Sequence, residues 1–118
     1  MRRGRKAFSD SDYFNSEVGI NELQGASYAD TSTVTQVNDT DSSTTLLSAN
    51  TDRKGLILFN NSTAIAYVKF GTTASATDFT IRLNPYGTYE SNAPCYTGRI
   101  DCIWTADSTG QMQITELS

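Results

Sequence analysis

Gly55-Leu56-Ile57-Leu58-Phe59-Asn60 is the stretch that decides the fold class, because an uninterrupted apolar run of this length is typical of a central strand covered on both faces. The turn-forming residues Asn60-Asn61-Ser62-Thr63 follow it, and Ala64-Ile65-Ala66-Tyr67-Val68-Lys69-Phe70 then forms a second apolar run. Two such runs joined by a short Asn/Ser/Thr loop predict a β-hairpin.

The rest of the chain predicts further short strands. Phe79, Ile81 and Leu83 alternate with polar residues, as in a strand with one buried face. In the turn Asn84-Pro85-Tyr86-Gly87, proline presets one backbone angle and glycine supplies a permissive position. Further strands are predicted at residues 44–49, 88–90, 99–105 and 111–117, with a weak edge strand around Val34 and Val37. About seven to eight short strands predict an all-β fold, a small antiparallel β-sandwich or barrel.

The length of 118 residues leaves room for one domain and an arm. Residues 1–30 show no sustained period and are predicted to form an extended N-terminal arm. Residues 31–118 form the β-sandwich module, which is best defined over residues 44–118. The arm keeps more large apolar side chains than a disordered tail usually holds: Tyr13, Phe14, Val18, Ile20, Leu23 and Tyr28. We therefore expect an arm that becomes ordered against a partner, the alternative being a disordered tail.

The charge of the chain is unevenly distributed. Nine basic and 13 acidic residues give a net charge of −4. Four of the basic residues lie at the start of the chain and are Arg2, Arg3, Arg5 and Lys6, so the remainder carries 5 − 13 = −8. An acidic body repels phosphate backbones, which argues against nucleic-acid binding. The basic start is expected to tether the protein to an acidic protein surface, the alternative being a solvated terminus.

The residue inventory excludes the common catalytic arrangements. The chain contains no histidine, so Ser-His-Asp and Cys-His sites cannot form. Glu90 and Asp101 are carboxylates on predicted strands, but scattered acids of this kind are typical of solvated surface. Asp39-Thr40-Asp41 lacks the glycine and the distant glutamate of a calcium loop. We therefore expect no catalytic residues, no metal and no cofactor.

Cys95 and Cys102 are the two cysteines, and without a CxxC pair or a histidine they cannot complete a zinc site. The basic start is not followed by the apolar run of a signal peptide, and no stretch approaches the about 20 apolar residues of a membrane span. A soluble protein that does not contact membranes is expected. Because nothing marks the chain as secreted, free thiols are favoured over a disulfide. Cys102 is expected to be buried, with Trp104 beside it in the core.

An ordered series of short motifs runs through the module. Its members are Asp52-Arg53-Lys54-Gly55-Leu56, Phe59-Asn60-Asn61-Ser62-Thr63-Ala64, Tyr67-Val68-Lys69-Phe70-Gly71, Phe79-Thr80-Ile81-Arg82-Leu83, Gly87-Thr88-Tyr89-Glu90, Tyr96-Thr97-Gly98-Arg99-Ile100, Ile103-Trp104 and Thr115-Glu116-Leu117. The series covers about residues 44–118 and resembles a small β-module that recurs in virion proteins of tailed bacteriophages. These proteins include head decoration (cement) proteins and head- or tail-associated fibres.

The resemblance implies a non-enzymatic structural role in the phage particle, after synthesis in the cytoplasm of the bacterial host. It also implies a symmetric homo-oligomer, for which a trimer is favoured. The N-terminal segment is too short for a fibre shaft, so we expect a capsid decoration protein on the head surface, with the major capsid protein as its partner. The alternatives are a tail, connector or fibre-base component of the virion, or a particle-displayed carbohydrate- or receptor-binding module.

The residues expected to contact the capsid lie in the arm. The charged ones are Arg2, Arg3, Arg5 and Lys6, and the apolar ones are Tyr13, Phe14, Ile20 and Leu23. In the module, Tyr86 lies at the tip of a predicted turn and is therefore expected to be an exposed contact.

Overall fold

The computed structural model describes residues 28–91 and 93–118 of the chain, so the predicted arm contacts Arg2, Arg3, Arg5, Lys6, Tyr13, Phe14, Ile20 and Leu23 lie outside the described residues. The all-β prediction is confirmed within the described part, whose secondary structure consists of eight strands. These are β2 (Ser32–Asn38), β3 (Thr44–Leu47), β4 (Gly55–Asn61), β5 (Ala66–Phe70), β6 (Ile81–Leu83), β7 (Thr88–Glu90), β8 (Ile100–Trp104) and β9 (Gln111–Leu117).

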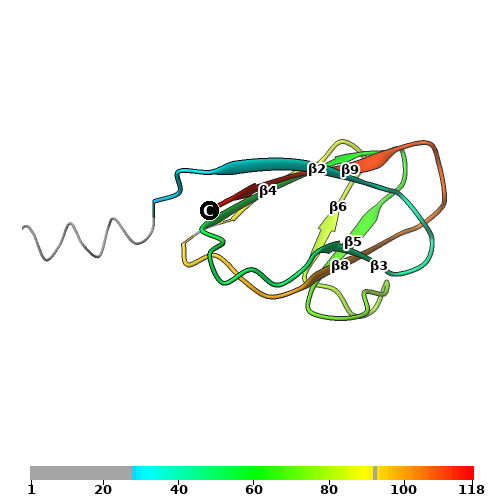
Figure 1. Cartoon of the computed structure of the whole chain (residues 1–118). Coiled ribbons are helices and arrows are strands. Elements are labelled where there is room, and N and C mark those ends of the chain that lie inside the picture. The colour runs from blue at the N-terminus through cyan, green and yellow to red at the C-terminus, as the bar shows by residue number, and fades with distance from the viewer. Residues whose placement is uncertain (1–27, 92) are drawn as a thin grey trace, which may run out of the picture.

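The strands form two antiparallel sheets of four strands each, which makes the fold a sandwich rather than a barrel (Figure 1). The strand order is β2-β9-β4-β7 in one sheet and β3-β8-β5-β6 in the other. Inward side chains from both sheets build one core between the layers, as face-to-face packing of two sheets requires. The buried apolar members are Leu46, Leu56, Leu58, Ala64, Ala66, Val68, Leu83, Ile100, Cys102, Trp104, Met112 and Ile114.

The predicted hairpin of residues 55–60 and 64–70 is wrong. β4 pairs with β7 and β9, whereas β5 pairs with β6 and β8 in the opposite sheet. Of the seven consecutive connections, six cross between the sheets, and β5–β6 is the one pair of sequence neighbours that hydrogen-bond to each other. A short polar connection between two apolar strands fits a corner of a sandwich as well as a hairpin, so the local pattern could not distinguish them.

The prediction that residues 55–60 form a strand covered on both faces holds for one face. Leu56, Leu58 and Asn60 are buried in the core, whereas Ile57 and Phe59 on the opposite face are half-buried. β4 is nevertheless central, since β9 and β7 flank it. Its continuous apolar sequence therefore supplies the core with one set of side chains and the outer surface with the other.

The strand predicted from the alternation of Phe79, Ile81 and Leu83 is shorter than expected. β6 begins at Ile81, and Phe79 lies before it on the outer side of the sheet, with its ring centroid 4.8 Å from that of Tyr67. Tyr67 is opposite the exposed Arg82 in the β5–β6 ladder, which places it on the outward face. The backbone before β6 thus turns Phe79 away from the core, where Leu83 is buried.

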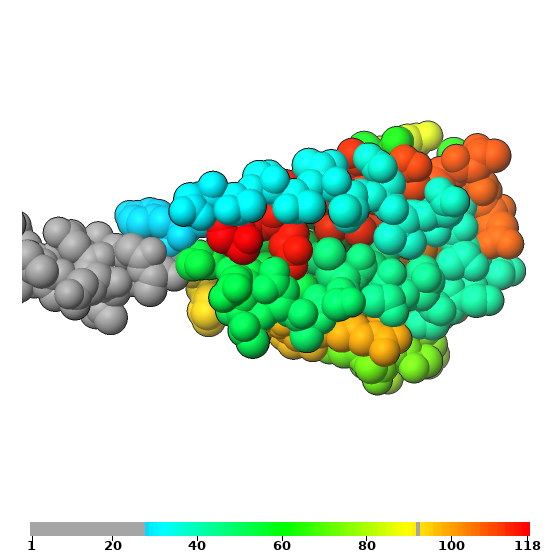
Figure 2. Space-filling model, viewed as in Figure 1, coloured from blue at the N-terminus to red at the C-terminus, as the bar shows by residue number. Residues whose placement is uncertain are grey.

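The module has two distinct ends. At the arm end, Thr31 and Ser118 exchange backbone hydrogen bonds of 2.8 and 2.9 Å, so the chain enters β2 beside the last residue of β9. At the loop end, the register aligns Asn38, Gln111 and Asn61, where β2 and β4 finish and β9 begins. Figure 2 shows residues 38–43 and 105–110 at the right-hand end and residues 28–31 on the left. Residues 28–31 therefore lie at the opposite end of the sandwich from the connections 38–43 and 105–110.

Candidate functional site

The outer surface of the β2-β9-β4-β7 sheet is almost uncharged. The strand register aligns the outward side chains in two rows that run across β2, β9, β4 and β7. The first row is Val34, Thr115, Ile57 and Glu90, and the second is Gln36, Gln113, Phe59 and Thr88. We call these eight residues the neutral face. Glu90 is its one charged member, and Val34 is 53% exposed. A sheet surface with exposed aliphatic and aromatic side chains among amides and hydroxyls is typical of a protein contact.

The outer surface of the other sheet is charged and partly covered. Lys69 of β5 forms a 2.6 Å ion pair with Asp78, and Arg99 forms a 2.8 Å ion pair with Asp101 of β8. Both Asp78 and Thr73, whose backbone N–H donates to Asp101, belong to the connection between β5 and β6. This connection packs over part of the outer surface and supplies partners to Lys69 and Asp101, which leaves the neutral face as the more available of the two surfaces.

The two carboxylates weighed from the sequence lie in different sheets. Glu90 is exposed on β7, whereas Asp101 is buried on the outward side of β8. Burial by itself raises the pKa of Asp101, but the hydrogen bonds and charge of Arg99 and the backbone N–H of Thr73 outweigh it, so the pKa is lowered overall. The structure therefore gives Asp101 the surroundings of a stably ionised carboxylate that anchors the covering loop.

Tyr86 occupies an unusual backbone conformation at the tip of the 84–87 turn. Its φ angle is +63° and its side chain is 58% exposed. Gly87 was expected to take the permissive conformation, but the positive φ falls on Tyr86. Glycine is needed at position 87 for space, because an added Cβ would lie 3.0 Å from the carbonyl oxygen of Asn84. The turn closes through the Gly87 N–H, which donates to that same oxygen over 2.8 Å. A large side chain is thus held out at a position that usually favours glycine.

Asn60 is the buried residue that fixes this turn. Its side-chain amide donates to the carbonyl oxygens of Ala64, Leu83 and Asn84 over 2.9, 3.2 and 3.1 Å, and its oxygen accepts the indole N–H of Trp104 over 3.1 Å. Its backbone carbonyl accepts the Tyr86 N–H over 2.8 Å. Every polar group of this side chain is therefore satisfied without water. One feature of the sequence could have indicated that Asn60 is buried, because it lies two residues after Leu58 and four after Leu56, on the same face of the strand.

Replacing Asn60 with leucine is expected to lower the free energy of unfolding by about 2–4 kcal/mol, because the Trp104 N–H and the Leu83 and Asn84 carbonyls would lose their partner in the interior. Urea unfolding measures this change. The adjacent exposed substitution Asn61→Leu is the control and should shift stability by less than about 0.5 kcal/mol. Equal stability of the two variants would contradict the role given to Asn60.

A hollow of about 330 Å³ lies beside Tyr86 at the loop end, and residues 61–63 and 108–111 line the rest of it. A second hollow of about 450 Å³ lies on the other side of the 107–110 loop and is lined by residues 38–40 and 107–110. The first hollow contains no charged residue in its lining, whereas the second includes Asp39 and Asp107.

Asp39 fastens the loops that form these hollows. Its carboxylate accepts hydrogen bonds from the Ser62 hydroxyl over 2.8 Å, from the Ser108 backbone N–H over 3.0 Å and from the Ser108 hydroxyl. Burial would raise the pKa of Asp39, but these hydrogen bonds lower it overall. A carboxyl with a lowered pKa in the folded state stabilises the fold above about pH 4, and this contribution is lost as the pH falls further.

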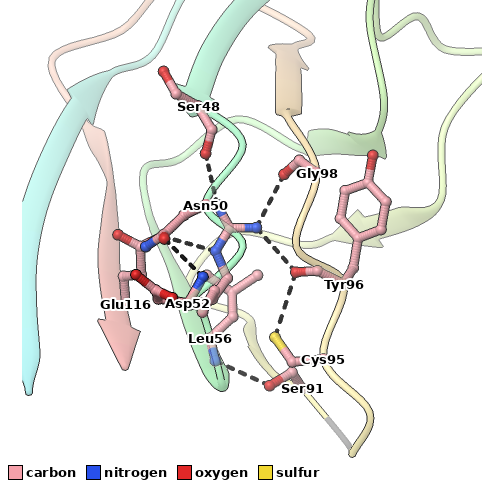
Figure 3. A network of polar contacts seen from close by, with 10 residues as sticks. Ser48, Asn50, Asp52, Leu56, Ser91, Cys95, Tyr96, Gly98 and Glu116 are labelled. Carbon is pink, nitrogen blue, oxygen red and sulfur yellow. Dashed lines mark hydrogen bonds and ion pairs between the residues drawn. The ribbon is translucent and has the colours of Figure 1, made fainter. Parts of the chain in front are cut away.

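Arg53 organises the opposite, arm end of the module (Figure 3). Its side chain is fully buried, and its Nε donates to a carboxylate oxygen of Glu116 over 2.8 Å. The remaining guanidinium nitrogens donate to the carbonyl oxygens of Tyr96, Gly98 and Ser48 over 2.9, 3.0 and 2.7 Å. One side chain therefore joins the segment before β4, the segment before β8 and the end of β9.

Neither metal nor disulfide chemistry is assembled by the described residues. No group of three or more Cys, Asp or Glu side chains converges there in a way that could hold a metal ion. Cys95 and Cys102 are both free thiols, and burial raises the pKa of Cys102 far above its ordinary value. Over the same residues, the structure contains no helix of the length and hydropathy that a membrane crossing needs.

Comparisons with protein-family models, with curated proteins and with solved structures give no match to this chain.

Proposed function

We propose that the chain is a non-enzymatic structural protein of a tailed-phage particle, a capsid decoration (cement) protein that binds the head surface as a homo-oligomer. The observation that carries the proposal is the neutral face. Residues 28–118 contain 5 basic and 9 acidic residues and so carry −4. Two copies of an acidic module approach each other with least repulsion through the surface that holds a single charge, Glu90. Support for the phage assignment comes from the motif series in residues 44–118.

The second copy is the occupant that we assign to the neutral face. Ile57 and Phe59 form its centre, and Val34 extends the apolar area toward the β2 edge. In a symmetric oligomer, with three copies as the favoured number, the neutral faces would converge on the symmetry axis, which would bury these side chains and leave the arm end of each copy free. Several arms acting together would then strengthen attachment through effective concentration.

The experiment that tests the function is the quantitative protein composition of purified particles of the phage that encodes the chain. A decoration protein is present in hundreds of copies, because it follows the capsid lattice. About a dozen copies or fewer would instead assign the chain to the tail, the connector or a fibre base. Its absence from the particle would overturn the proposal.

The arm is expected to provide the attachment to the capsid. Its basic start meets acidic capsid groups through Arg2, Arg3, Arg5 and Lys6, while Tyr13, Phe14, Ile20 and Leu23 enter apolar pockets. Removing residues 1–25 should therefore abolish binding to undecorated heads, measured by co-sedimentation, and leave the circular dichroism of the β-module unchanged. If the truncated protein binds as well as the full chain, the residues that attach it to the capsid lie in the module.

A further inference from the structure

We propose that the hollow beside Tyr86 binds an uncharged saccharide. The binding groups are an exposed aromatic ring and a set of neutral hydrogen-bonding side chains, and they stand at the loop end of the sandwich. The volume of about 330 Å³ is within the range of small-ligand sites. This inference concerns a ligand rather than the particle, so it does not depend on the proposed function.

The polar groups around the hollow match the chemistry of a sugar. Asn61 and Gln111 contribute carboxamides, and Thr63 and Thr109 contribute hydroxyls. Within the described part of the chain, no hydrogen bond occupies these four side chains. A carboxamide or hydroxyl both donates and accepts, which suits the hydroxyl groups of a saccharide. The Tyr86 ring offers an apolar face for the C–H side of a pyranose.

Tyr86 is held in position by a rigid buried support. Its φ of +63° costs about 1 kcal/mol or more for a residue with a side chain, and such strain persists where the surroundings enforce it. Here Asn60 enforces it, because its side chain binds the carbonyl oxygens of Leu83 and Asn84 and is itself fixed by Trp104. Because the backbone at Tyr86 is already fixed in this way, ligand stacking on its ring costs little backbone entropy.

The charges around the hollow select against acidic ligands. Asp39 lies beneath it, bonded to Ser62 and Ser108, which also line the hollow. Asp107 is exposed on the neighbouring side of the 107–110 loop. Both are carboxylates, and no basic residue lines either hollow. Anionic sugars would therefore be repelled, and neutral ones preferred.

The hollow lies next to the neutral face, at the loop end of the module. Asn61 and Gln111 form the row that follows the last row of the neutral face toward the loop end. The described chain enters the module at the opposite end, where Thr31 pairs with Ser118. A copy anchored by its arm would thus carry the hollow on the side away from the anchor.

The test is binding of the full chain to an array of neutral and acidic bacterial oligosaccharides, followed by titration of the strongest neutral oligosaccharide into 15N-labelled protein. We expect neutral members to bind and the side-chain amides of Asn61 and Gln111 to shift. Tyr86→Ala should weaken binding at least about tenfold through loss of the stacking face, and Tyr86→Phe should retain most of it. The control Phe79→Ala, which removes an exposed ring from the other sheet, should leave binding unchanged.

Three results would overturn the proposal. They are the absence of any glycan binding, selective binding of acidic glycans, and equal binding by Tyr86→Ala and the unmodified chain. If Tyr86→Ala alters the oligomeric state while no oligosaccharide binds, Tyr86 is a protein contact and the saccharide site is refuted. Because the array requires no phage particle, its outcome is read separately from the copy number that tests the proposed function.

Discussion

Replacing Arg53 with methionine is expected to lower the free energy of unfolding by about 3–5 kcal/mol, because the substitution removes the charge that pairs with Glu116 and the donors of three interior carbonyl groups. A domain of this size shifts its midpoint by roughly 4–8 °C per kcal/mol, so the loss amounts to at least about 12 °C. Thermal and urea unfolding monitored by circular dichroism measure it directly.

Two further variants separate the contributions at this site. Arg53→Lys keeps the positive charge but lacks the planar fork that reaches Tyr96, Gly98 and Ser48 together, so its stability should fall between those of the unmodified chain and Arg53→Met. Arg82→Met is the matched control, since Arg82 is exposed on β6. It should change stability by less than about 0.5 kcal/mol. If Arg53→Met is no less stable than this control, the buried network does not hold the arm end together.

Phe59→Asp is expected to dissociate the proposed homo-oligomer. Phe59 is at the centre of the neutral face, where its ring centroid lies 6.5 Å from that of Tyr86. A carboxylate there would be buried against a second copy without a cationic partner, at a cost of several kcal/mol for each ion. Sedimentation equilibrium over a range of protein concentrations measures the mass. The substituted protein should remain monomeric at concentrations where the unmodified chain associates.

The control for this experiment introduces the same charge elsewhere. Ala76 is exposed in the connection between β5 and β6, which covers the other sheet, so Ala76→Asp should leave the oligomer intact. Each variant should retain the circular dichroism of the unmodified protein, since Phe59 is only half-buried in a single copy. If Phe59→Asp still associates, the copies contact each other through a surface other than the neutral face. If the unmodified chain is monomeric, self-association is refuted.

Local sequence patterns predicted individual strands well and their pairing poorly. Strands 88–90 and 111–117 were predicted with their observed bounds, because each is delimited by proline, glycine or turn-forming residues. The partner of residues 55–60 was wrong, because alternation and turn composition describe one segment at a time. Register between Leu58 and Ile114, far apart in the chain, is set by the shared core and not by any local signal.

The candidate surfaces show the same division. The exposure of a turn-tip tyrosine follows from its position beside proline and glycine, but its positive φ depends on Asn60 reaching across from β4. From the sequence, Asp39 was considered for a calcium loop and rejected, and its buried role was not predicted, because the two serines that its carboxylate binds lie in other loops. Arg53 belongs to one of the motifs of the predicted module. The residues next to it in the sequence do not indicate that its side chain is the centre of a buried network.

The sequence by itself determined that the module is all-β, because short apolar and alternating runs between turns can bury their side chains only in sheets. It also determined that no histidine-dependent catalysis is available, because that is a matter of inventory. Tertiary structure alone decided which strands became neighbours, and with them the neutral face, the support beneath Tyr86 and the hollow beside it. The physical reason is that six of the seven connections cross between sheets, so residues that share a surface come from distant segments.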